Sequence, residues 1–111
     1  MDNVKNDAYY VKKMLKDILF IIEKTKGITL EELEENEVLC DSVLFRLIQI
    51  SESSGKLSQA FKESHRGIPW QAIKGMRNRI VHEYGDVELD VVHQTIAEDM
   101  PEICKLLESL I

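Results

Sequence analysis

Apolar residues recur at alternating spacings of three and four along most of this 111-residue chain. This spacing brings one side chain per turn to the same side of an α-helix, so each such stretch predicts an amphipathic helix with one buried face. No stretch alternates apolar and polar residues as a half-buried β-strand does. The pattern predicts an all-α protein, an up-and-down bundle of four long helices plus a short helix, in a single domain over residues 1–111.

The first half of the chain predicts three of these helices. The first spans residues 7–24. A short helix then begins after Thr29, because Glu32 stands three residues later in the spacing of a capping box. The long helix spans residues 38–62, and Gly55 is expected to loosen it locally because glycine has a low helix propensity.

The second half predicts two further helices. Pro69 suits the first turn of a helix, where a missing N–H costs little, and this helix is expected to end near Gly85. The last helix begins near Glu88. Because Pro101 lies inside it and has no N–H, we expect a kink or break between residues 97 and 101.

The net charge of −6 argues against tight nonspecific binding to long nucleic-acid duplexes. One segment, residues 62–82, differs: it holds five basic residues and one acidic residue, a net charge of +4 that leaves −10 for the rest of the chain. A local basic patch on an acidic protein can hold a few phosphates, but an ordinary solvated helix face would show the same count. The residues in question are Lys62, Arg66, Lys74, Arg77 and Arg79, against Glu63.

Composition also bears on location and on metals. No apolar run approaches the roughly 20 residues that span a bilayer, and residues 1–7 lack the layout of a signal peptide, so we expect a cytoplasmic protein with no membrane partner. Cys40 and Cys104 have no metal ligands near them in sequence and are expected to be reduced thiols packed as small apolar residues. The three histidines are scattered, so we predict neither a metal site nor a cofactor.

The stretch from Arg77 to Tyr84 contains an arginine, four residues, His82, one residue and a tyrosine. Arginine offers a fixed fork of donors to phosphate oxygens, and histidine transfers protons near neutral pH. On an ideal helix Arg77 and His82 are separated by about 140° around the axis and about 7.5 Å along it. Asn78 and His82, four residues apart, are neighbours on the helix surface. The motif can therefore converge if Arg77 bends around the helix end, or if two copies of the chain share one cleft.

Each of these residues also has a purely structural interpretation, which the residues alone leave open. The structural interpretations are an ion pair for Arg77, a surface position near a helix end for His82, a core position for Tyr84, a surface pair of Arg79 with Glu83, solvation for Asn78 and a packing anchor for Trp70.

Four segments of the chain are similar to those of one known family: the early tyrosine helix over Asp7–Ile22, the Arg46–Glu52 segment, the Ile68-Pro69-Trp70 motif and the stretch from Gly75 to Tyr84. The Pro-Trp, Met-Arg-Asn and Val-His-Glu-Tyr motifs and the helix after them occur in that family's order and spacing. The chain resembles the HepT-like family of HEPN-domain proteins, the toxin halves of toxin–antitoxin pairs. The resemblance extends over nearly the whole chain. One departure is Ser51-Glu52-Ser53, where the family usually has Gly-Glu-Ala.

The resemblance implies a HEPN-like antiparallel bundle that forms a homodimer, with the Arg-x4-His motifs of both subunits lining a cleft. It implies a metal-independent endoribonuclease toxin of a type VII-like toxin–antitoxin system. Arg77 would bind and polarise the scissile phosphate of RNA, His82 would act as general acid or base, and Asn78 would orient His82. Tyr84 would be adenylylated by a minimal nucleotidyltransferase (MNT) antitoxin. Weaker candidates for RNA contacts are Lys74, Arg79 and Arg46.

Two other functions remain open from the sequence. The chain could be a non-catalytic nucleotide-binding or regulatory subunit of a minimal nucleotidyltransferase, which a small basic patch on an acidic protein fits equally well. It could also be a structural dimer in which the motif forms only the interface. The acidic stretch from Glu31 to Asp41 offers a docking surface for a basic face of a partner.

Overall fold

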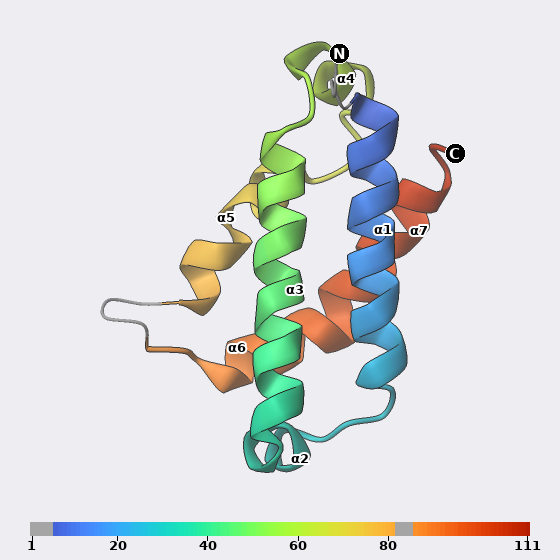
Figure 1. Ribbon diagram of the computed structural model, residues 1–111. Helices are drawn as coiled ribbons and strands as arrows, with labels where there is room; N and C mark the ends of the chain where they lie inside the picture. The colour runs from blue at the N-terminus through green and yellow to red at the C-terminus, as the bar shows by residue number, and fades with distance from the viewer. Residues whose placement is uncertain (1–5, 82–85) are drawn as a thin grey trace, which may run out of the picture.

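The computed structural model describes residues 6–81 and 86–111, and within these ranges every regular element is helical (Figure 1), which confirms the all-α class. The up-and-down order of the bundle and the homodimer stay predictions. The elements are α1 (Asp7–Lys24), α2 (Leu30–Glu35), α3 (Glu37–Gly55), α4 (Gln59–Ser64), α5 (Trp70–Ile80), α6 (Leu89–Gln94), the π-helical turn η2 (Thr95–Asp99) and α7 (Met100–Glu108).

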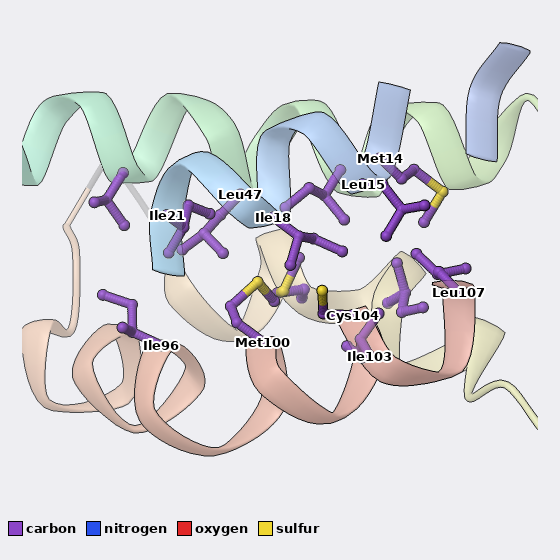
Figure 2. Packing of buried hydrophobic residues seen from close by; sticks show 14 of the residues in the cluster. Met14, Leu15, Ile18, Ile21, Leu47, Ile96, Met100, Ile103, Cys104 and Leu107 are labelled. Atoms are coloured by element: carbon purple, nitrogen blue, oxygen red, sulfur yellow. The ribbon is translucent and has the colours of Figure 1, made fainter. Parts of the chain in front are cut away.

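Helix α1 packs against α3 on one side and α7 on the other. Its bounds match the predicted residues 7–24, and its N-cap is Asn6, whose side-chain oxygen accepts the backbone N–H of Tyr9 at 3.0 Å. Of the apolar stripe that the three–four spacing predicts for α1, Val11, Leu15 and Ile18 are buried in the core, Ile22 is half-buried and Ala8 is exposed. Figure 2 shows side chains of α1 facing those of η2 and α7, the labelled residues being Met14, Leu15, Ile18 and Ile21 on one side and Ile96, Met100, Ile103, Cys104 and Leu107 on the other.

The short helix α2 begins as predicted. The Thr29 hydroxyl accepts the Glu32 N–H at 3.1 Å, and the Glu32 carboxylate accepts the Thr29 N–H at 2.9 Å, so the capping box is complete. Leu33 is fully buried and attaches this acidic turn to the core.

The prediction of one long helix over residues 38–62 was wrong, because α3 ends at Gly55 and a separate helix, α4, begins at Gln59. Ser58 is the N-cap of α4: its hydroxyl accepts the Phe61 N–H at 3.1 Å. Both the N–H and the hydroxyl of Ser58 donate to the Asp7 carboxylate, at 2.7 Å each. A distant carboxylate therefore stabilises the break after Gly55, so the three–four spacing that runs through it did not reveal it.

The kink or break predicted between residues 97 and 101 takes the form of a π-helical turn, η2, between α6 and α7. The Met100 N–H donates to the Thr95 carbonyl, five residues back, and η2 joins α6 to α7 directly. Pro101 has no N–H to offer the carbonyl of Ala97, so an α-helical hydrogen bond is missing at this point in any case. A wider turn of the helix absorbs that loss.

Both cysteines are buried, free thiols, as predicted. Burial raises the pKa of the Cys40 thiol, and Asp41 and Glu37 raise it further; burial also raises the pKa of Cys104. Both thiols are therefore protonated and unreactive near neutral pH. Among the described residues, no helix is both long and apolar enough to cross a membrane.

Candidate functional site

Helix α5 carries the arginine of the Arg-x4-His motif, and Trp70 anchors its start. Pro69 is the N-cap, one residue before the first helical residue. The Trp70 ring is 9% exposed, lies against Phe61 with ring centroids 6.2 Å apart, and donates its Nε1–H to the His65 carbonyl at 3.0 Å. The interpretation of Trp70 as a packing anchor is confirmed.

The helix ends at Ile80, which contradicts the predicted end near Gly85. Val81 has extended backbone angles, φ −107° and ψ 117°, and forms an antiparallel bridge with Val87. The Ile80 carbonyl accepts the Glu88 N–H at 3.1 Å, so a residue from beyond the motif satisfies this helix end. A β-branched valine suits the extended conformation, and the bridge to Val87 and the hydrogen bond from Glu88 hold the chain in it.

The backbone leaves the helix at Val81. The predicted helical neighbourhood of Asn78 and His82 involves His82 and lies outside the described residues. The predicted roles of His82 as acid or base and of Tyr84 as the adenylylated residue lie outside the described residues, as does the predicted surface pair of Arg79 with Glu83.

Arg77 is exposed in the last turn of α5, where the partial negative charge of the helix C-terminus favours a cation. Its carbonyl accepts the Val81 N–H at 2.9 Å, which fixes the backbone of this turn. Within residues 6–81 and 86–111, its guanidinium has neither an ion-pair partner nor a hydrogen bond. An exposed cation is what the predicted phosphate contact requires.

Arg79 lies on the opposite edge of α5, since residues two apart in a helix are about 160° apart around its axis. One of its guanidinium nitrogens, Nη1, is 4.0 Å from Oδ2 of Asp99 in η2, and Nη2 donates to the Ala72 carbonyl at 3.4 Å. The structure thus places Arg79 at the boundary between α5 and η2, away from Arg77.

Lys74 is exposed and is a helical neighbour of Arg77, three residues on, and of Asn78, four residues on. The Ser51 hydroxyl of α3 donates to the Lys74 carbonyl at 2.9 Å, so this edge of α5 faces α3. Of the candidate residues that the structure describes, Lys74 therefore lies beside both Arg77 and Asn78, which are themselves about 100° apart around the helix.

Arg46 belongs to another part of the molecule, the boundary between α3 and α1. Its Nη1 is 2.8 Å from Oδ1 of Asp17, and its guanidinium carbon is 4.0 Å from the centre of the Phe20 ring. Lys13 contacts the other oxygen of Asp17 at 3.2 Å. Sequence reasoning missed Asp17, a buried carboxylate with two cations, although its spacing of four from Lys13 was a visible signal.

The two described histidines have structural contacts. His65 stacks on Phe61 with ring centroids 4.5 Å apart, and Nε2 of His93 is 2.8 Å from the Ile28 carbonyl oxygen. In the part of the chain that the structure describes, no group of three or more His, Cys, Asp and Glu side chains is arranged to hold a metal ion.

Comparison with known proteins gives consistent matches over nearly the full chain. A family model described as ribonuclease HepT-like matches residues 14–110. A protein of Caldanaerobacter subterraneus subsp. tengcongensis named as a candidate RNase, TTE0752, is 32% identical over 108 residues, which cover 97% of this chain and 96% of that protein. The probable ribonuclease HepT of Thermococcus cleftensis is 34% identical over 104 residues, 89% of this chain and 94% of its own length.

A third relative, MJ1380 of Methanocaldococcus jannaschii, is also named as a candidate RNase and is 32% identical over 102 residues, 88% of this chain and 94% of that protein. No solved structure matches the chain. The relatives are named for ribonuclease activity, and the family model spans most of the helical domain. The chain therefore belongs to the ribonuclease HepT-like family.

Proposed function

We propose that this chain is a metal-independent endoribonuclease toxin of a type VII-like toxin–antitoxin system. Membership of the ribonuclease HepT-like family supports ribonuclease activity. The observation that carries the assignment to this site is the exposed Arg77, whose charge is unpaired within the described residues while the neighbouring Arg79 is engaged by Asp99. A cation at the end of a well-anchored helix suits a phosphodiester substrate.

The proposed reaction is attack of the ribose 2′-hydroxyl on the adjacent phosphorus. The 2′-oxygen loses its proton to a base and forms a bond to phosphorus, while the bond from phosphorus to the 5′-oxygen breaks and that oxygen takes up a proton. The products are a 2′,3′-cyclic phosphate and a 5′-hydroxyl. Arg77 would bind and polarise the phosphate, His82 would serve as general acid or base, and Asn78 would support His82.

We further propose that the chain acts as a homodimer in which two Arg-x4-His motifs share one cleft. Two pairs of large apolar side chains are exposed on the single chain and would be buried by a second copy. Tyr9 (41%) and Phe45 (58%) line one open groove, and Leu19 (46%) and Ile111 (67%) line another; Val38 (79%) is exposed apart from both.

Silencing is proposed to occur by adenylylation of Tyr84 by an MNT antitoxin. An added AMP brings a phosphate and a base two residues from His82 in the sequence, and would repel and block the RNA phosphate. The acidic stretch from Glu31 to Asp41 is mostly exposed and would serve as the docking surface for a basic face of the antitoxin.

The proposal is tested by incubating the purified chain and its Arg77→Ala and His82→Ala variants with labelled RNA in EDTA, with the product ends identified by mass. We expect cyclic phosphate ends with the wild type only, and growth inhibition only by the wild type in cells. Circular dichroism and thermal unfolding control for the fold, which Arg77→Ala should leave intact because the side chain is exposed.

Cleavage retained by both variants would refute the catalytic assignment. If the wild type does not cleave, its intact mass decides between two explanations: an added AMP that is absent from Tyr84→Phe means a silenced enzyme. An unmodified and inactive wild type would favour the non-catalytic subunit of a minimal nucleotidyltransferase instead.

A further inference from the structure

An open pocket of about 550 Å³ lies between α4 and the first half of α5. Figure 1 shows α4 beyond the end of α3, and α5 packs against α3. Lys62 of α4, Arg66 of the following loop and Lys74 of α5 line the pocket, and the buried Trp70 lies between them in the sequence and also lines it.

The pocket carries a positive charge on a protein that is acidic overall. Three cations and one carboxylate, Glu63, line it, and Glu63 accepts a hydrogen bond from Gln59 at 3.3 Å. The charge of Lys62 also lowers the pKa of the Asp7 carboxyl, whereas Arg66 and Lys74 are exposed and form no ion pair within the described ranges. The excess of cations favours an anion in the pocket, because its binding lowers the electrostatic free energy.

Arg77 does not line the pocket, but it is a helical neighbour of Lys74, which does. Lys74 lines the pocket, and Arg77 follows it by three residues on the same edge of α5, about 60° around the helix and about 4.5 Å along its axis. The hydrogen bond from Ser51 to the Lys74 carbonyl fixes this edge against α3. The cation on the other edge, Arg79, is 4.0 Å from Asp99, whereas Lys74 and Arg77 form no ion pair among the described residues.

We infer that this pocket binds the phosphates of a single RNA strand whose scissile phosphate lies at Arg77. Lys62, Arg66 and Lys74 act as positioning residues that hold the strand on one side of the cleavage point. A single strand fits because three cations neutralise a few phosphates, whereas a long duplex would bring many more phosphates against an acidic surface. The inference rests on the proposed ribonuclease function for its ligand.

The test uses the full chain with His82→Ala, so that bound RNA stays intact, and a fluorescein-labelled 20-nucleotide RNA of unpaired sequence. Lys62→Gln, Arg66→Gln and Lys74→Gln are combined in one variant. The matched control combines Lys12→Gln, Lys26→Gln and Lys105→Gln, which are exposed, lie away from the pocket and change the net charge equally. Affinity is measured by fluorescence anisotropy across a salt series, and thermal unfolding establishes that both variants fold.

The pocket variant is expected to bind at least about 30-fold more weakly than its parent at 50 mM NaCl. Its slope of log affinity against log salt should be smaller by about 2, since each phosphate contact on a single strand contributes roughly 0.7. The control should stay within about threefold. Equal losses in the pocket variant and the control would overturn the inference, because net charge alone would then account for binding.

Cleavage by the wild-type chain is measured separately and separates this inference from the proposed function. If the wild type cleaves RNA but the pocket variant loses no more affinity than the control, RNA binding by the pocket is refuted and the proposed ribonuclease function stands. Pocket-specific binding of RNA without any cleavage by an unmodified wild type supports the pocket and refutes the ribonuclease.

Discussion

Arg77 and Arg79 are two residues apart on one helix and have different surroundings. Arg79 reaches Asp99 and the Ala72 carbonyl, whereas Arg77 is exposed and unpaired among the described residues. Replacement of an arginine that packs or forms an ion pair should lower the free energy of unfolding. Replacement of an arginine that binds the substrate should lower the rate of cleavage instead.

We therefore predict that Arg77→Lys lowers the rate of RNA cleavage by at least about 100-fold, because lysine keeps the charge but loses the fork of donors that matches a phosphate. Its free energy of unfolding should stay within about 0.5 kcal/mol of the wild type. Arg79→Lys is the matched control and should cost less than about threefold in rate, as its partner Asp99 lies on the other side of α5. Single-turnover cleavage with urea unfolding measures both. Equal rate losses would contradict the different roles.

Replacement of Arg46 is expected to lower the stability of the fold rather than the rate of RNA cleavage. Asp17 is 4% exposed, and its carboxylate forms ion pairs with Arg46 and Lys13. Arg46→Ala would leave this buried carboxylate with Lys13 as its one remaining partner among the described residues. We expect a loss of about 2 kcal/mol in the free energy of unfolding, measured in urea. The loss of the stacking on Phe20 adds to it.

A double variant, Arg46→Met with Asp17→Leu, removes both charges and should recover much of that stability. If Arg46→Ala instead leaves stability unchanged and weakens RNA binding, the earlier assignment of Arg46 as an RNA contact holds and the structural role of this pair is wrong.

At the residue scale, sequence reasoning located Lys74, Arg77 and Asn78 on one helix but could not separate Arg77 from Arg79. The distinction depends on Asp99, which is 20 residues further along the chain. The same reasoning counted the basic residues from 62 to 82 without placing Lys62 and Arg66 at one pocket, because α4 had been read as part of a longer helix.

At the scale of the elements, a single hydrogen-bonded cap decides where α4 begins. Ser58 is held by Asp7, 51 residues away in the sequence. The hydrogen bond from the Ser58 N–H is the main cause that lowers the pKa of the Asp7 carboxyl, followed by the bond from the Ser58 hydroxyl and the charge of Lys62. A local reading of apolar spacing cannot include such a partner, whereas the capping box of α2, which is local, was predicted correctly.

This cap predicts a specific dependence of stability on pH. Because folding lowers the pKa of Asp7, its carboxylate stabilises the folded state at pH above its unfolded pKa, and this contribution is lost as the pH falls through the lower folded pKa. Asp7→Asn should therefore destabilise the protein at pH 7, and the difference should shrink as the pH falls through the folded pKa of Asp7. Thermal unfolding between pH 2 and 7 measures the effect.

Asp41→Asn is the control, since Asp41 is exposed on α3. Its difference from the wild type should be small at every pH. A difference between wild type and Asp7→Asn that is independent of pH would show that the Ser58 cap needs only an oxygen acceptor and not its charge.

At the scale of the whole molecule, the exposed apolar side chains predict self-association. The 12.8-kDa chain should sediment at twice that mass at micromolar concentration. Because folding and association are coupled in a dimer, its melting temperature should rise with protein concentration. A single species of 12.8 kDa at 100 µM, with a melting temperature independent of concentration, would contradict the proposed shared cleft.

The π-helical turn has a consequence for how this family can vary. Val92, Ile96 and Met100 are all buried although two successive spacings of four drift by about 80° on an α-helix, and η2 absorbs that drift. Helix α6 thereby faces α2 and α5 while α7, in the same run, faces α1. A turn with i→i+5 bonds holds one residue more than an α-helical turn, so loss of one codon here would convert it to an α-helical turn and leave the later side chains near their present faces. Homologous chains should therefore accept a single-residue deletion in this turn more readily than in α1 or α3.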